Sequence, residues 1–431
     1  MSAETFDVSQ TLDHLFRHES GKMVAILTRI FGIEHLTLVE DVVQEALARA
    51  VQTWPFYGVP NNPSAWILRA SRNLALDVVR RQKVFRDKEA EIVRLMDQPE
   101  RATNEVSFAG DEFADDTLKL MFVCCHPSLA AEAQISLALN TLCGFSVAEI
   151  GRAFLTSEAA IAKRLTRAKQ KIREARLRFE IPEGQELLQR VDAVLQSIYL
   201  LFNEGYKASS GDALVRADLC HEAIRLGGLL SKHPAGDTPR THALLALMLL
   251  NAARLPARVH DDGTLLRLQE QDRSLWDQGM IARGMYHFTR SASGHALSEF
   301  HLQAGIVACH CASKDYDATD WPRILGLYDE LVAMAPSPVI FLNRAIVVAN
   351  VHGPDAGLAA VAAIKAVEPL QAYHLYHAVL GELELRRQRA AIAVGHFEQA
   401  HALATIPSER EFLEKRLAEC RRNAESRHAP A

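Results

Sequence analysis

The stretch FSVAEIGRAFLTSEAAIAKRLTRAKQKI, residues 145–172, decides how the rest of the chain is interpreted. It predicts two helices joined by a tight turn. Ser146 and Glu149, three residues apart, make a capping box for the first helix. Ser157 is suited to cap the second helix, whose acidic first turn complements the positive end of the helix dipole. The stretch therefore predicts a helix-turn-helix.

The second of these helices has an apolar face and a basic face. Small residues at its start, followed by basic residues on the exposed side, suit entry into a DNA major groove. An ordinary helical hairpin with a solvated basic face would show the same pattern, so the stretch alone does not decide between the two. The apolar face is predicted to hold Ile161, Leu165, Ala168 and Ile172. The candidate DNA-contacting residues are Ser157, Ala160, Lys163, Arg164, Arg167 and Lys171.

The composition is that of a globular protein. The chain has 431 residues, which allows two to four domains, and 48% of them are hydrophobic. The formal net charge of −5 argues at first against nucleic-acid binding. However, positive residues concentrate in segments 69–88 and 152–178, with an acidic cluster between them. The average charge therefore does not exclude a DNA-binding protein.

Several sequence features bear on membranes, metals and cofactors. The longest apolar run, residues 243–250, is far shorter than the ~20 residues that span a bilayer. The polar, acidic start of the sequence leads us to expect no signal peptide. The seven cysteines are odd in number and irregularly spaced, which favours a reducing compartment. The Cys/His clusters at 124–126 and 309–311 offer adjacent ligands, which rarely close a tetrahedral zinc site. We expect a soluble, cytoplasmic protein that binds no metal and no cofactor.

Apolar residues recur at helical spacing through most of the chain, which predicts an all-α fold. Pro55 is expected to end the second helix, and a loop rich in Pro, Gly and Asn follows at 55–63. Residues 84–116 have poor periodicity and are predicted to form a linker. The helices predicted before the helix-turn-helix are 12–31, 35–54, 64–82, 116–125 and 130–142. Those predicted after it are 187–203, 213–230, 239–255, 265–288, 299–312 and 321–335.

The end of the chain shows a repeat. Small and aromatic residues fall at the offsets of a tetratricopeptide unit, where the two helices of a repeat touch. Thirty-four residues earlier, Ala359 and Ala366 match two of these positions. We therefore predict a helical array. The residues at the tetratricopeptide offsets are Leu380, Gly381, Ala393, Phe397 and Ala400.

Three motifs follow one another along the chain: DVVQEALARAVQTW at 41–54, NPSAWILRASRNLALDVVRRQ at 62–82 and the helix-turn-helix at 145–172. With these motifs in this order, residues 12–180 resemble sigma factors of the extracytoplasmic-function class. The segment DVVQEALARAVQTW, 41–54, resembles the acidic-Gln-acidic signature of sigma region 2, which grips core RNA polymerase. NPSAWILRASRNLALDVVRRQ, 62–82, resembles the helix that opens and reads the −10 element. The helix-turn-helix resembles sigma region 4, the reader of the −35 element.

The resemblance implies roles for particular residues and an order of domains. It places core-polymerase contacts at Asp41, Gln44 and Glu45. It places −10 contacts at Asn62, Trp66, Arg69, Asn73, Asp77, Arg80 and Arg81. The implied domains are sigma region 2 at 10–83, a linker at 84–116, sigma region 4 at 117–180 and a helical C-terminal domain at 187–431.

Further segments look like the subgroup whose sigma core is fused to a C-terminal tetratricopeptide-like domain. They include DDTLKLMFVCCHPSL at 115–129, LLFNEGY at 200–206 and PSPVIFLNRA at 336–345. The resemblance then implies a non-enzymatic factor whose partners are core RNA polymerase and promoter DNA. It also implies that the C-terminal domain takes the regulatory place of a separate anti-sigma factor.

Two other function classes are compatible with parts of the sequence. One is a one-component repressor or activator with a sensor domain, which would leave residues 41–82 unexplained. The other is an enzyme in residues 187–431, with a pocket lined by Tyr206, Trp276, His374 and His377, although no acid/base pair emerges there.

Overall fold

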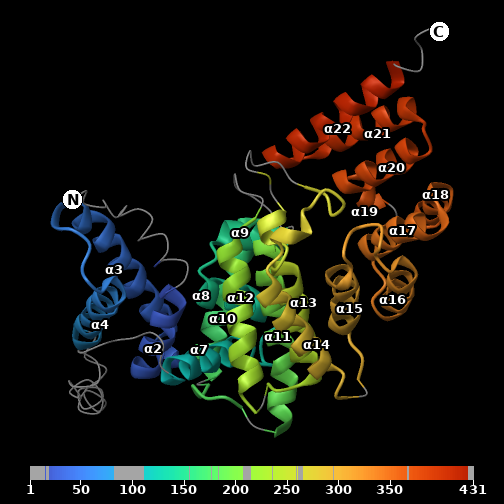
Figure 1. Ribbon diagram of the computed structural model, residues 1–431. Helices are drawn as coiled ribbons and strands as arrows, with labels where there is room; N and C mark the ends of the chain where they lie inside the picture. The colour runs from blue at the N-terminus through green and yellow to red at the C-terminus, as the bar shows by residue number, and fades with distance from the viewer. Residues whose placement is uncertain are drawn as a thin grey trace, which may run out of the picture. The chain divides into compact units, whose positions relative to one another are not determined.

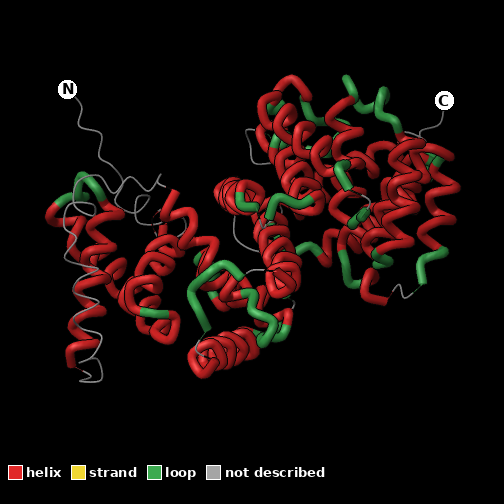
Figure 2. The backbone as a smooth tube through the Cα atoms, turned by 90° about the horizontal axis from the view of Figure 1, so that it is seen from below, coloured by secondary structure: helices red, strands yellow, loops and turns green. Residues whose placement is uncertain are grey.

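In the computed structural model, the protein is built from helices and loops, and the described residues contain no strand (Figure 1, Figure 2). The predicted all-α fold is therefore confirmed. The chain divides into two compact units, Met1–Leu201 and Phe202–Ala431. The structure describes residues 15, 19–81, 111–154, 156–175, 177–182, 184–206, 215–234, 236–258, 260, 266–294, 296–365 and 368–425.

The first unit holds the helix-turn-helix and the helices before it. Its apolar core includes Met23, Leu27 and Ile150, none of which is exposed. α11 begins in this unit and continues into the second. The elements of the first unit are α2 (Ser20–Phe31), η2 (Ile33–His35), α3 (Leu36–Tyr57), α4 (Pro63–Arg81), α7 (Asp111–Cys124), α8 (Ala131–Cys143), α9 (Val147–Ala153), α10 (Glu158–Ala175) and α11 (Gly184–Tyr206).

Two of the predicted boundaries in this unit were wrong. α3 continues through Pro55 to Tyr57, because a proline near the end of a helix gives up only one hydrogen bond. The helix ends at Gly58, whose φ of 83° suits glycine. α7 begins at Asp111, within the segment predicted as linker. The rest of that linker, residues 82–110, lies outside the described residues.

The second unit is a succession of helices in which sequence neighbours pack on each other (Figure 1). Its core forms separate apolar clusters, one around Leu342 and Leu383 and another around Phe397 and Leu413. The elements of this unit are α12 (Ala217–Lys232), α13 (Pro239–Ala252), η3 (Leu255–Ala257), η4 (Arg273–Leu275), α14 (Gln278–Ser291), α15 (Glu299–Ala312), α16 (Trp321–Met334), α17 (Pro338–His352), α18 (Pro354–Ala362), α19 (Glu368–Gln371), α20 (His374–Arg386), α21 (Ala390–Leu403) and α22 (Pro407–Glu425).

The single helix predicted over 265–288 was wrong. The described residues before α14 form turns and the short helix η4. Asp272 caps η4 by accepting a hydrogen bond from the Ser274 N–H, and Asp277 caps α14 by accepting one from the Met280 N–H, both at 2.8 Å. Aspartate competes for nearby backbone N–H groups in this way, so it starts helices more readily than it continues them.

The predicted contact between the last paired helices is present. Gly381 of α20 lies against the Phe397 ring of α21, where an added Cβ would come within 2.9 Å of the ring. Ala393, Phe397 and Ala400 are completely buried, as predicted from their spacing. The proposed match one repeat earlier was wrong at Ala359, which is exposed. Ala366, the other earlier match, lies outside the described residues.

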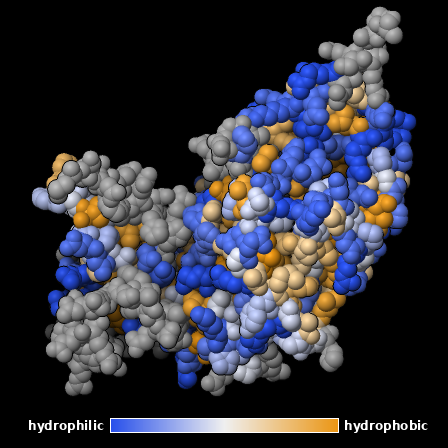
Figure 3. All heavy atoms as spheres, viewed as in Figure 1, coloured by the Kyte–Doolittle hydropathy of each residue, from blue (hydrophilic) through white to orange (hydrophobic). Residues whose placement is uncertain are grey.

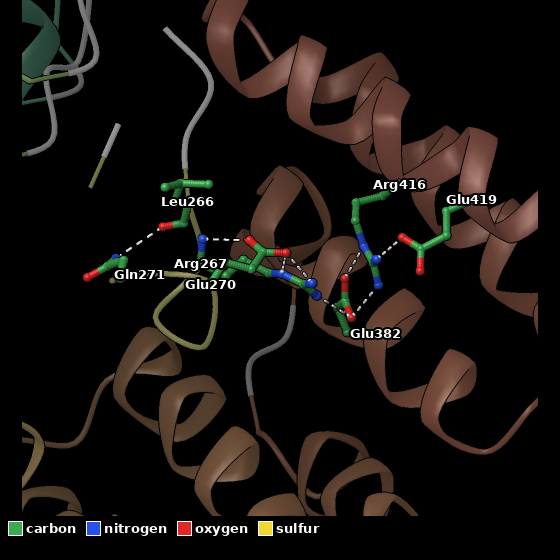
Figure 4. Close-up of polar contacts among 7 residues, drawn as sticks. All are labelled: Leu266, Arg267, Glu270, Gln271, Glu382, Arg416 and Glu419. Carbon is green, nitrogen blue, oxygen red and sulfur yellow. Dashed lines mark hydrogen bonds and ion pairs between the residues drawn. The ribbon is translucent and has the colours of Figure 1, made fainter. Parts of the chain in front are cut away.

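An ion-pair network joins the loop before η4 to the end of the array (Figure 4). Arg267 donates to Glu270 beside it, at 3.0 Å, and to Glu382 of α20, at 3.1 Å. Arg416 of α22 approaches Glu382 from the other side, at 2.6 and 2.8 Å, and also pairs with Glu419. Glu382 of α20 therefore binds two arginines, one in the loop before η4 and one in α22, and so connects three segments that are distant in the sequence.

No helix among the described residues is both long and apolar enough to cross a bilayer. On the face seen in Figure 3, hydrophilic residues cover most of the described surface, with apolar residues in small groups between them.

Candidate nucleic-acid interface

The helix-turn-helix consists of α9 and α10, and both predicted caps are present. The Ser146 N–H donates to the Glu149 carboxylate at 2.8 Å, and the Glu149 N–H donates to the Ser146 hydroxyl at 3.2 Å. The Ser157 hydroxyl accepts from the Ala160 N–H at 3.3 Å. Gly151 allows the turn to approach, because an added Cβ would lie 3.0 Å from the Thr156 carbonyl oxygen.

The two faces of α10 are as the sequence predicts. The four apolar residues Ile161, Leu165, Ala168 and Ile172 are buried. On the opposite side the predicted DNA-contacting residues are exposed, except that Arg164 is half-buried. The surface presented by Ser157, Ala160, Lys163, Arg164, Arg167 and Lys171 is called the α10 face below.

The structure divides the basic residues of the α10 face into two kinds. Arg164 pairs with Glu132 of α8 at 2.6 Å and lies over the Phe154 ring, and Lys171 donates to the Ser128 carbonyl. Lys163 and Arg167 make no ion pair with any residue that the structure describes. Lys163 and Arg167 can therefore contact a ligand without first breaking an ion pair. Helical spacing alone does not distinguish them from Arg164 and Lys171.

α4 carries the second predicted surface. Pro63 occupies its first turn, and Asn62 caps it by accepting from the Ala65 N–H at 3.0 Å. The other predicted residues follow at helical spacing on one side and are exposed, with Trp66 half-buried. The side chain of Arg81 lies outside the described residues. The surface formed by Asn62, Trp66, Arg69, Asn73, Asp77 and Arg80 is called the α4 face below.

Aromatic residues lie beside the α4 face. Trp66 packs edge-on against Trp54 of α3, with ring centroids 5.6 Å apart, and Trp54 is buried. Phe56 and Tyr57, at the end of α3, are 83% and 88% exposed. Because the two residues are adjacent, they add neighbouring apolar surface, and contiguous apolar patches are typical of interaction sites. The sequence placed both residues in the loop at 55–63, and their high exposure could not be predicted from it.

Asp41, Gln44 and Glu45 lie together on the exposed side of α3, as expected of an interaction surface. Glu45 pairs with Arg49 one turn later. Asp41 and Gln44 line a groove of about 320 Å³, whose other wall includes Phe145 and Lys169.

This groove lies where the N-terminal helices meet the helix-turn-helix part of the same unit. α2 packs directly on α7 and α8 (Figure 1). Gly21 allows this, because an added Cβ would come within 2.1 Å of the Leu142 carbonyl oxygen. Arg29 of α2 pairs with the buried Asp116 of α7 at 2.8 Å.

A second polar contact across this boundary centres on Glu40 of α3. It pairs with Lys169 of α10 at 2.6 Å and accepts a hydrogen bond from the Thr141 hydroxyl of α8 at 2.7 Å. The two charged side chains are only 14% and 19% exposed. The set formed by Glu40, Thr141 and Lys169 is called the Glu40 latch below.

α11 packs on the opposite, cysteine-containing end of α7. The buried Arg190 donates to the Phe122 carbonyl at 3.3 Å and pairs with Glu186 in its own helix. Ser197 lies 4.0 Å from the thiol of Cys125, whose pKa is raised to about 12 by burial. This thiol is a packing residue, and the described residues contain no group of three or more metal ligands.

Comparisons with known proteins agree with this arrangement. Residues 15–84 match the family model for Sigma-70 region 2, and residues 119–172 match the model for Sigma-70, region 4. The chain belongs to the extracytoplasmic-function sigma factors. Beyond region 4 it carries an extension, of which residues 190–292 match a family of unknown function (DUF6596).

One relative is similar to this sigma factor over most of its length. It is described as uncharacterized protein R00370 of Rhizobium meliloti (strain 1021). The two chains are 40% identical over 386 residues, which cover 89% of this chain and 90% of the relative. No solved structure matches the chain. The protein is thus a factor for promoter-specific transcription initiation, whose region 2 contains α2–α4 and whose region 4 contains α7–α10.

Proposed function

We propose that this sigma factor reads promoters at two points, with the α10 face on the −35 element and the α4 face on the −10 element. The observation that carries the proposal is the pair of exposed basic helix faces, one in each sigma region. Each face is backed by a buried apolar side, so its charged residues are held outward. Within the −35 contact, Lys163 and Arg167 reach base edges, because they are not engaged inside the domain.

The −10 contact needs groups that receive bases leaving the stack. Unstacking costs a few kcal/mol per base, and stacking on an aromatic side chain offsets roughly 1–3 kcal/mol of it. Phe56, Tyr57 and Trp66 offer aromatic surface next to the α4 face. Arg69 and Arg80 then hold the phosphates of the opened strand.

Asp41, Gln44 and Glu45 bind core RNA polymerase in this proposal. They are exposed, acidic or polar, and aligned on one helix. Asp41 and Gln44 line the groove that faces region 4. Access of core polymerase to these two residues is therefore restricted while regions 2 and 4 are packed together.

The packed arrangement is proposed to be a closed state of the factor. Two promoter elements two turns apart lie about 70 Å from each other along the DNA. Regions 2 and 4 in direct contact are too close to occupy both elements. Residues 82–110 alone could span on the order of 100 Å when extended, so opening is geometrically possible. Core polymerase therefore has to separate the regions, against the Glu40 latch and the Gly21 contact.

The C-terminal extension is proposed to modulate this activity, in the manner of a tetratricopeptide-like array that contacts the sigma core or polymerase. Support comes from α11, whose first half packs on region 4 through Arg190 and Ser197. The helix pair α20–α21, with Gly381 against Phe397, has the packing expected of such arrays.

The packing of α11 determines how the modulation is tested. A chain ending after Tyr206 keeps α11 on region 4, whereas a chain ending at Pro182 removes it and uncovers Cys125. We expect the shorter chain to be less stable than the longer one. The longer chain should retain its fold and differ from the full-length protein in transcription from a cognate promoter. Equal transcription by the full-length protein and by the chain ending after Tyr206 would contradict modulation by the extension.

Run-off transcription tests the function as a whole. The full chain, added to core RNA polymerase, should start transcripts at a promoter that core enzyme alone ignores. Protein that binds this promoter DNA without ever directing core enzyme would instead be a one-component regulator.

A further inference from the structure

Three arginines gather in the second unit where α13 ends. Arg254 follows α13, Arg258 closes η3, and Arg273 begins η4. The guanidinium carbons of Arg254 and Arg273 lie 5.4 and 4.9 Å from the centre of the buried Trp276 ring. Arg258 lies 3.7 Å from the centre of the Tyr206 ring. Cations and aromatic rings thus alternate at this point.

Several donors in this cluster lack an acceptor among the described residues. They are buried atoms: Nε of Arg254, Nη1 of Arg258 and Nε1 of Trp276. Nδ1 of the buried His310 is in the same condition. A buried donor without an acceptor costs roughly 1–3 kcal/mol. Among the described residues these donors are left without an acceptor, and the Nε atom of Arg254 belongs to a guanidinium that lies over the Trp276 ring. An acceptor from outside the described residues would satisfy them.

The charges of the arginines also indicate that this acceptor would be an anionic group. Burial lowers the pKa of Arg258 and of Arg273, and the neighbouring Arg254 lowers both further. In contrast, the pKa of Arg267 is raised despite its burial, because Glu270 and Glu382 face it. The cluster therefore carries positive charge that the described carboxylates do not neutralise.

The nearest acidic influence is weak. Asp315 acts on Arg273, but its carboxylate is 3.9 Å from Lys314 and accepts the Ala318 N–H at 2.8 Å. Arg273 instead donates to the carbonyls of His310 and Ser313, at 2.7 and 2.6 Å. These bonds fix one guanidinium while Arg254 and Arg258 keep donors available.

We propose that Arg254, Arg258 and Arg273 form a binding site for the phosphate group of a small anionic ligand. Guanidinium groups bind phosphate through paired, charge-assisted hydrogen bonds, which suits them better than a point charge. Arg254 and Arg258 bind the oxyanion directly, and the Trp276 N–H donates a further bond. Arg273 positions Trp276 and adds charge.

His310 contributes as a neutral group. Burial lowers its pKa to about 3, and Arg254 and Arg273 act in the same direction. At neutral pH its Nδ1 therefore donates to or accepts from the ligand without changing the charge of the site. The site is in the extension and includes none of the residues assigned to promoter reading, so it goes beyond the proposed function and its failure would leave that function untouched.

Isothermal titration calorimetry on the full chain tests the site. The probes are inorganic phosphate, pyrophosphate and a nucleoside triphosphate, each at an ionic strength kept constant with sodium chloride. We expect saturable binding of at least one probe at a single site. Arg258→Met should weaken it by about ten-fold or more, since two charge-assisted bonds are lost. Arg410→Met, at an exposed arginine of α22, is the matched control and should leave binding unchanged.

A second variant keeps the test decisive if Arg258→Met does not fold. Arg258→Lys retains the charge but loses the fork, and it should bind more weakly than the native chain. No saturable binding by any probe would overturn the proposal, as would binding that Arg410→Met weakens equally. Binding that appears only after Asp261 and Asp262 are both changed to Asn would also overturn it, because the chain's own carboxylates would then be the counter-ions.

Discussion

The Glu40 latch gives the sharpest test of the closed state. Replacing Lys169 by Glu puts two carboxylates where an ion pair stood at 2.6 Å. Exposed pairs contribute less than about 1 kcal/mol, whereas breaking a buried pair costs about 3–5 kcal/mol. With both side chains less than a fifth exposed, we place this pair between the two, at about 2 kcal/mol.

This free energy predicts the direction and size of the effect on polymerase binding. The apparent affinity for core polymerase is proportional to the fraction of molecules in the open, binding-competent state. Destabilising the closed state by about 2 kcal/mol should therefore tighten binding to core RNA polymerase by about 30-fold. The assay is equilibrium fluorescence anisotropy with labelled core enzyme and no DNA, so that an effect of the substitution on DNA binding does not contribute to the measured affinity.

A charge swap supplies the control. In the double variant Glu40→Lys, Lys169→Glu, the attraction is restored with reversed polarity, and affinity should return toward that of the native chain. Glu40→Lys alone completes the cycle and isolates the pairwise energy from any direct effect next to Asp41. Gly21→Ala changes no charge, but its added Cβ would clash with the Leu142 carbonyl oxygen and push α2 away from α8. This variant should therefore also bind core polymerase more tightly. Unchanged affinity in Lys169→Glu, or a double variant that behaves like the single one, would refute the closed state.

Three further predictions concern the sigma faces and the array. Changing Lys163 or Arg167 to Ala should cost about 1–3 kcal/mol of discrimination for the −35 element, measured by competition binding with altered elements. Replacing both Phe56 and Tyr57 by Ser should reduce permanganate reactivity of thymines in the −10 region while leaving affinity for core polymerase unchanged. Glu382→Gln removes the carboxylate between two arginines and should destabilise the second unit by about 2–3 kcal/mol in thermal unfolding, whereas Glu411→Gln, on the exposed side of α22, should have little effect.

The local structure of region 4 could be predicted in detail from the sequence. Its helices are set by short-range rules: the capping box at Ser146, the cap at Ser157 and the four apolar residues of α10. The α4 face was predicted for the same reason, because helical spacing fixes which residues share a side. The helix predicted over 265–288 failed, since apolar spacing outweighed the two aspartates that interrupt it.

Contacts between distant segments could not be predicted in this way. Nothing near Glu40 in the sequence indicates that Lys169, or the Thr141 hydroxyl, will face it. Likewise, Arg164 and Arg167 are equivalent by spacing, and only the position of Glu132 on α8 separates them. The arginines at 254, 258 and 273 come together through the turn after α13, which no periodicity describes.

By itself, the sequence determined the helices, their buried sides and the order of the sigma regions, because these depend on interactions within a few residues. It also predicted the exposed residues that we propose to contact DNA. The tertiary structure decided which of them are already engaged, how regions 2 and 4 close on each other, and that α11 belongs with region 4. Those outcomes depend on pairs such as Gly21 with Leu142, more than a hundred residues apart, whose fit is specified only when the chain has folded.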